Sequence, residues 1–201
     1  PFLIDWTVVY AGINSGTYSD DWALPSGAFE LLKESVTNYV SLRAYDVAGN
    51  TVTLTDAFSV FKDTSVPSLT DNQDGDDNWR RSSGTVYNVD FADSGGSGIS
   101  RIQLRASPNA GTLGPWYFDW SDAVTAIASD SYTADWALPP ALWSQLGEGI
   151  NHISVKVWDA AQNSAVLPAQ PFYIKKDTTT PVFVNGESGG DVSWLNSGRV
   201  N

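Results

Sequence analysis

Apolar and polar positions alternate along several short stretches of the chain. In residues 100–106 the apolar side chains are Ile102, Leu104 and Ala106, and charged or polar residues lie between them. Residues 85–91 and 152–158 alternate in the same way. An apolar period of two is typical of a strand that buries one face. These stretches therefore predict half-buried β-strands.

Shorter apolar segments add strands at residues 66–70, 116–120, 131–138 and 165–174, and residues 140–146 fit one helical turn. Glycine-rich or tight-turn segments separate them, at residues 93–98 and 160–163. About seven short strands with turns every 8–12 residues indicate a two-sheet antiparallel β-sandwich. No pattern of alternating helices and strands supports a parallel sheet.

The chain also contains an internal repeat with an offset of 114 residues. Residues 18–25 read YSDDWALP and residues 132–139 read YTADWALP, with six of eight positions identical. The tripeptide KDT stands at 62–64 and again at 176–178, and a proline follows each at the same spacing. We therefore expect a complete repeat at residues 64–178, the C-terminal part of another at 1–63, and the start of a third at 179–201. Because the sequence begins and ends within repeats, we expect it to be a segment of a longer tandem array. The alternative is that neighbouring copies of the chain donate the missing strands to one another.

Composition narrows the classes of protein. The chain has 201 residues, enough for one or two domains, and 42% of them are hydrophobic, too many for a disordered chain. Its net charge of −12 disfavours nucleic acid as a partner. No apolar run reaches the roughly 18–20 residues of a membrane helix, so we expect no membrane insertion in this segment. Without Cys, neither disulfides nor a thiol nucleophile can contribute.

Specific motifs point to a family. They are YNVDF at residues 87–91, Asp93 with SGI at 97–99, DVAGN at 46–50, and DTSVP at 63–67. With them the chain resembles the bacterial immunoglobulin-like repeats of large extracellular surface proteins of the adhesin type. The resemblance implies an all-β fold of tandem immunoglobulin-like antiparallel β-sandwich repeats, and an extracellular or cell-surface location.

The expected function is that of a structural spacer in an adhesin stalk, sheath or filament. Its partners would be adjacent repeats of the same chain and other copies in a filament or surface layer. The alternative is a carbohydrate- or protein-binding accessory module of a secreted enzyme. Fold alone does not decide between these two functions.

Catalysis has little support in the sequence. The single histidine, His152, falls on the outward face of its expected strand, without the pattern of a nucleophile and an orienting acid. A repeated sandwich with short loops offers little cleft. We therefore expect no enzyme activity and assign no catalytic residue.

An acidic segment, DNQDGDDN at residues 71–78, is the candidate metal site. Oxygen ligands at short spacing suit calcium, and the candidates are Asp71, Asp74, Asp76 and Asp77. The alternative is a solvated acidic loop without a metal.

Aromatic residues are frequent, with nine Trp. Most recur at the repeat offset or exchange for another aromatic, as packing positions tolerate. Tyr45 and Trp158 fall on outward strand positions, so we expect them to contact another domain or another chain. Trp79 and Trp194 lie near the repeat boundaries and are candidates for packing across junctions.

Overall fold

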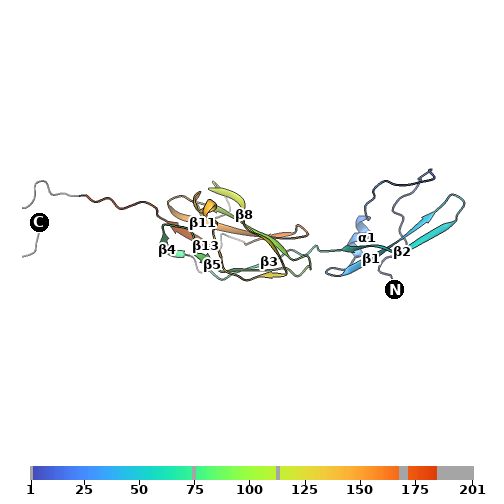
Figure 1. Ribbon diagram of the computed structural model, residues 1–201, viewed down its shortest axis with the longest axis horizontal. Helices are drawn as coiled ribbons and strands as arrows, with labels where there is room; N and C mark the ends of the chain where they lie inside the picture. Colours follow the sequence, from blue (N-terminus) through green and yellow to red (C-terminus); the bar gives the residue numbers. More distant parts are fainter. Residues whose placement is uncertain (1, 74–75, 112–113, 168–171, 185–201) are drawn as a thin grey trace, which may run out of the picture.

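The computed structural model describes residues 2–73, 76–111, 114–167 and 172–184. The described chain forms two bodies that lie end to end along its longest axis (Figure 1). We call residues 2–63 the N-terminal body and residues 64–178 the central body. Within the described ranges the molecule is built mostly of β-strands, with two short helices.

The N-terminal body contains one helix and one hairpin. The helix is α1 (Ser26–Leu31), and the hairpin strands are β1 (Thr37–Tyr45) and β2 (Thr51–Phe61). The strands pair antiparallel from Tyr45↔Thr51 to Thr37↔Phe61. Asp46 closes the turn between them, because its carboxylate accepts the backbone N–H of Asn50 at 2.7 Å.

The central body is a sandwich of β-sheets. Its strands and helix are β3 (Ser68–Asp71), β4 (Asp76–Arg80), β5 (Val86–Tyr87), β6 (Val89–Ala92), β7 (Ile99–Ser107), β8 (Phe118–Ser129), β9 (Ser131–Tyr132), β10 (Trp136–Ala137), α2 (Pro140–Trp143), β11 (Gly149–Asp159), β12 (Ser164–Val166) and β13 (Phe172–Lys176). The largest sheet has the order β4-β13-β11-β7-β8, with β12 also paired to β11. Smaller sheets, β3-β6-β9 and β10-β5, complete the fold.

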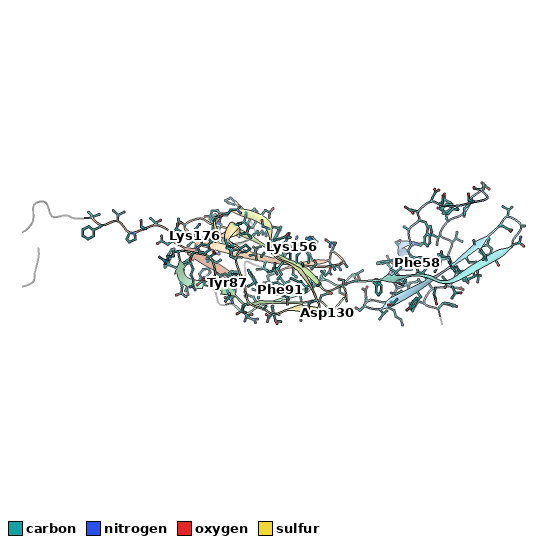
Figure 2. All side chains as sticks on the ribbon, viewed as in Figure 1. Phe58, Tyr87, Phe91, Asp130, Lys156 and Lys176 are labelled. Atoms are coloured by element: carbon teal, nitrogen blue, oxygen red, sulfur yellow. The ribbon has the colours of Figure 1, made fainter. Side chains whose placement is uncertain are left out.

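Alternation in the sequence matches burial in this sandwich. Ile102 and Leu104 on β7, and Val155 and Val157 on β11, are completely buried. Phe91 on β6 belongs to the same apolar cluster (Figure 2). The predicted all-β character and the inward positions of these strands are confirmed.

Several parts of the secondary structure differ from the sequence prediction. The strand expected at residues 131–138 is divided into β9 and β10, which belong to different sheets. Residues 76–80 form strand β4 rather than a loop, and β4 lies parallel to β13. Polar contacts hold it there: Asp77 Oδ1 accepts from Tyr173 Oη at 2.6 Å and from Lys175 Nζ at 2.8 Å. The strand expected at 116–120 instead runs from Phe118 to Ser129, because β7 offers it a long antiparallel partner.

The helices α1 and α2 are six and four residues long. No helix of the described residues has the length and apolar character needed to cross a membrane.

Candidate functional site at the joint between the bodies

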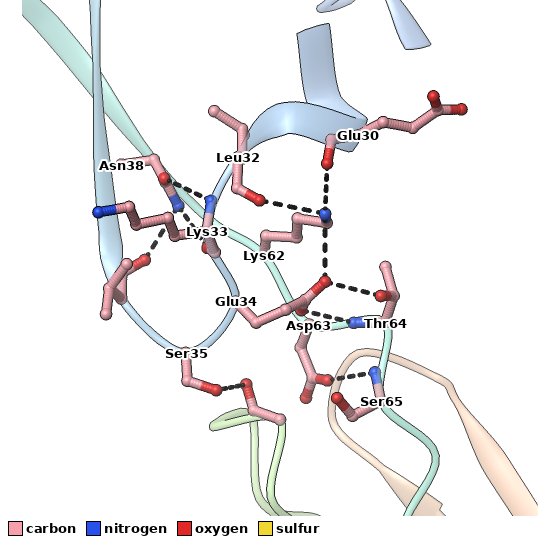
Figure 3. Close-up of polar contacts among 12 residues, drawn as sticks. Glu30, Leu32, Lys33, Glu34, Ser35, Asn38, Lys62, Asp63, Thr64 and Ser65 are labelled. Atoms are coloured by element: carbon pink, nitrogen blue, oxygen red, sulfur yellow. Dashed lines mark hydrogen bonds and ion pairs between the residues drawn. The ribbon is translucent and has the colours of Figure 1, made fainter. Parts of the chain in front are cut away.

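A carboxylate fixes the segment that leaves each body. Glu34 accepts two hydrogen bonds from Thr64, at 3.0 Å from the backbone N–H and 2.7 Å from the hydroxyl (Figure 3). Glu148, 114 residues further along, accepts the same two bonds from Thr178. The hydroxyl bonds from these threonines lower the pKa of both glutamates below 4.5, the ordinary value. Both carboxylates are therefore ionised at neutral pH.

A lysine two residues before each of these threonines closes the end of the preceding helix. Lys62 Nζ donates to the carbonyl oxygens of Glu30 and Leu32 at 2.9 and 3.1 Å (Figure 3). Lys176 Nζ donates to two carbonyl oxygens at and after the end of α2, at 3.3 and 2.7 Å. Carbonyls at a helix C-terminus lack intrahelical partners, so the ammonium groups stabilise both helix ends.

A buried asparagine shapes the loop between helix and strand in both bodies. Asn38 Oδ1 accepts the N–H of Lys33 at 3.0 Å, and Asn38 Nδ2 donates to the Lys33 carbonyl at 2.9 Å. Asn151 makes the same pair of bonds with Gly147, at 3.0 and 2.9 Å. The polar network of this loop thus occurs once in each body.

The two bodies meet through a small set of polar contacts, which we call the joint. On the N-terminal side it consists of Ser35 and Asp63, and on the central side of residues 94–97 and Asn163, whose Nδ2 donates to the Asp63 carbonyl at 3.1 Å. Ser35 Oγ donates to the Gly95 carbonyl at 2.7 Å (Figure 3), and Asp63 Oδ2 accepts the Ser97 N–H at 3.1 Å. A groove beside these contacts is lined by residues of both bodies.

Glycine is required on the central side of the joint. A Cβ placed on Gly95 would lie 1.7 Å from Asp63 Oδ1, which is an overlap rather than a contact. Gly96 has φ +92°, and its Cβ position lies 3.1 Å from the Ser35 Cα. The absence of side chains at both positions lets the two backbones approach closely.

Three carboxylates converge at the joint. Asp63, Asp93 and Asp159 place one oxygen each within 4.8 Å of one another, and they are the one such trio among the described residues. Asp93 and Asp159 are buried. Carboxylate oxygens are calcium ligands, so this group could hold a cation. The carboxylates also accept backbone N–H bonds, for example from Gly98 to Asp93 Oδ2 at 2.8 Å, and these bonds alone give them a structural role.

The predicted metal ligands lie at the other end of the central body. Asp71 ends β3, Asp76 and Asp77 are in β4, and Asp74 lies outside the described residues. Asp76 is buried and forms an ion pair with Arg80, with Nε–Oδ2 at 3.0 Å. Hydrogen bonds from Lys175 and Tyr173 lower the pKa of Asp77. Calcium binding by this segment stays a prediction.

The predicted interface residues are spread over the molecule. Tyr45 is 64% exposed at the end of β1, and Trp79 is 60% exposed on β4. Trp158 is half-buried on β11, where its Nε1 donates to Gln103 Oε1 at 2.8 Å. Trp194 lies outside the described residues. The structure brings none of the described three together.

Trp158 belongs to a row of alternating rings and cations on the outer face of the large sheet. In order, the row is Trp116, Arg105, Trp120, Lys156, Trp158 and Arg101. The cationic atoms lie 3.9 to 5.2 Å from the ring centres. Cation–π contacts of this kind hold the rings in place. We call this row the cation–aromatic row.

Sequence reasoning missed the joint. Asp63 falls in the motif at residues 63–67 and Gly95, Gly96 and Ser97 in the turn at 93–98, whereas Ser35 lies in no motif identified from the sequence. One signal was available: Glu34 and Glu148, two of only four Glu, stand 114 residues apart. No protein-family model matches the chain, and no curated protein sequence matches it with significant similarity.

Proposed function

We propose that this chain is a spacer of tandem immunoglobulin-like repeats in an extracellular surface protein, as in an adhesin stalk, sheath or filament. The observation that carries the proposal is the joint. Ser35 and Asp63 of one body are hydrogen-bonded to the glycine turn of the next, and the bodies lie end to end (Figure 1). A chain of units connected in this way would hold its ends apart.

Repetition of the polar contacts supports the repeat boundaries. The Glu–Thr pair, the lysine at the helix end and the buried asparagine each occur twice, at offsets of 113 or 114 residues. One aromatic pair recurs at the same offset. The ring centroids of Trp22 and Phe58 are 5.8 Å apart, and those of Trp136 and Phe172 are 6.2 Å apart. We assign residues 64–178 to one repeat, 1–63 to the C-terminal part of another, and 179–201 to the start of a third.

A distance measurement between the two bodies tests the spacer function. The chain has no Cys, so Glu30→Cys and Thr125→Cys place one spin label on each body. Both positions are exposed. We expect one narrow distance distribution by pulsed electron paramagnetic resonance, together with an elongated particle by small-angle scattering. A broad distribution or a compact particle would contradict the proposal.

The alternative, a carbohydrate- or protein-binding module, is favoured by one observation, the cation–aromatic row. Aromatic rings can stack on sugars, and cations can bind acidic groups. The rings of the row, however, already contact cations of the same face. Affinity electrophoresis against a panel of polysaccharides separates the functions: retardation that is lost in Trp158→Ala supports binding, and no retardation supports the spacer.

A further inference from the structure

Strand β1 has one free edge in the part of the chain that the structure describes. There it pairs with β2 on one side only, in a sheet of two strands. Its counterpart at an offset of 113 residues, β11, is flanked on both sides, by β7 on one edge and by β12 and β13 on the other. In the described residues, the N-terminal body has a counterpart for β12 and β13, which is β2, and none for β7.

The apolar face of the same hairpin is incompletely covered. Val40 and Leu42 on β1 are half-buried, whereas their counterparts Ile153 and Val155 on β11 are completely buried. Phe58 on β2 is 37% exposed, and its counterpart Phe172 is 3% exposed (Figure 2). In the central body these positions are covered by residues of β5, β6 and β7. The uncovered face therefore corresponds to one missing half of a sandwich.

Residues 4–15 also lack the strand partner that their counterparts have in the central body. They correspond to β8, yet they form no strand. Their local contacts are nevertheless those of β8: Trp6 N donates to Asp5 Oδ1 at 2.7 Å, and Trp120 N to Asp119 Oδ1 at 2.8 Å. Among the described residues of the central body, β7 is the one strand that pairs with β8. A missing β7 counterpart thus explains both the free edge of β1 and the unpaired residues 4–15.

We propose that the free edge and the apolar face of the β1–β2 hairpin bind a further half-repeat with the sequence pattern of residues 64–114, joined in cis to the N-terminal side of this segment. This inference rests on the proposed repeat arrangement. The bound strand would resemble β7, with small and branched apolar residues at alternate positions facing Val40, Leu42 and Ala44. By analogy with Val155↔Leu104, Leu42 would lie opposite the leucine of that strand.

Exchange between two copies of the chain is the competing source of such a half-repeat. The residues that would have to be donated are already fully engaged: Phe91 and Leu104 are buried in their own sandwich. Donation would expose this core before the new contacts form. A separate half-repeat, linked in cis, covers the hairpin without that cost, and it joins the chain at the position that the 114-residue offset requires.

Fusion of a second copy of residues 64–114 in front of Pro1 of the full chain tests the proposal. We expect β1 amides to exchange with deuterium at least about tenfold more slowly in the fusion protein, because they gain strand partners. Residues 4–15 should acquire protection as well. The matched control is the same fusion with aspartate at the positions of the added copy that correspond to Ile102 and Leu104, which should not protect β1.

Each outcome has one meaning. Unchanged exchange of β1 in the fusion protein overturns the inference, and equal protection in the aspartate control overturns the apolar docking argument. Concentration-dependent dimers of the unfused chain, with β1 protected, would overturn the cis assignment in favour of exchange. The spin-label distance between the bodies is measured on the same proteins. A narrow distance distribution with an unprotected β1 rejects this inference and leaves the spacer function standing. A broad distribution with a protected β1 rejects the spacer function and leaves this inference standing.

Discussion

Replacing Gly95 by alanine should loosen the joint. The added Cβ would lie 1.7 Å from Asp63 Oδ1 and 2.3 Å from Asp63 Cγ, so the carboxylate has to leave its place. Leaving breaks its hydrogen bonds with the N–H groups of Ser97, at 3.1 Å, and Ser65, at 3.0 Å. Asp63 is partly exposed, so the displaced carboxylate can form hydrogen bonds with water, which offset part of the lost stabilisation.

The size of the effect follows from these two bonds. Hydrogen bonds to a charged group contribute about 1.5–3 kcal/mol when buried, and partial exposure reduces this, so we expect a total loss of about 1–3 kcal/mol. That corresponds to a shift of about 5- to 150-fold from the docked toward the undocked arrangement of the bodies. The folding of each body should change little, because the altered contact lies between them.

Spin labels at positions 30 and 125 measure this shift directly. Gly95→Ala should broaden the distance distribution, while the thermal unfolding of the central body stays close to that of the parent protein. Gly16→Ala is the matched control, since a Cβ there meets no atom within 4 Å. If the distance distribution of Gly95→Ala is as narrow as that of Gly16→Ala, the joint does not depend on the close approach of Asp63 to Gly95, and the prediction is refuted.

Three further predictions concern stability. Asn151→Ala should lower the free energy of unfolding by about 2–4 kcal/mol in urea titrations, because it leaves buried backbone groups of one loop without partners, and an effect below about 1 kcal/mol would contradict this. Glu148→Gln should lower the Tm at pH 7, and the difference from the parent protein should shrink as the pH falls below 4.5. The folded pKa of Glu148 is lowered, so its stabilisation is present above the unfolded value and is lost as the pH falls through the folded value. The predicted calcium site at residues 71–77 requires that calcium raise the Tm and that the variant Asp74→Ala with Asp76→Ala abolish the increase; a Tm unaffected by EDTA speaks against it.

Several features of the fold could be predicted from the sequence, because they depend on neighbouring residues. The alternation in residues 100–106 and 152–158 placed β7 and β11 with their buried faces. Residues 140–146 were expected to form a helical turn, and α2 lies there. The strand β4 was missed, since its acidic residues are held by Tyr173 and Lys175, almost 100 positions away.

The joint was missed for a similar reason. Its glycines are typical of a turn, and residues 93–98 do form a turn, in which Asp93 accepts the N–H groups of Gly95 and Gly98. That the same glycines receive Ser35 and Asp63 of the other body depends on how two bodies meet in space. A pattern of residue types along the chain does not contain this information.

By itself, then, the amino-acid sequence determined the period of the strands, the turns between them and the short-range hydrogen bonds, such as those of Asp5 with Trp6 and of Asp119 with Trp120. Tertiary structure decided which of these segments became strands. Residues 4–15 and β8 share their local contacts, yet only β8 is a strand, because only β8 has β7 beside it. A strand is stabilised by backbone hydrogen bonds to a partner that is distant in the sequence, and so its formation depends on that partner as much as on its own residues.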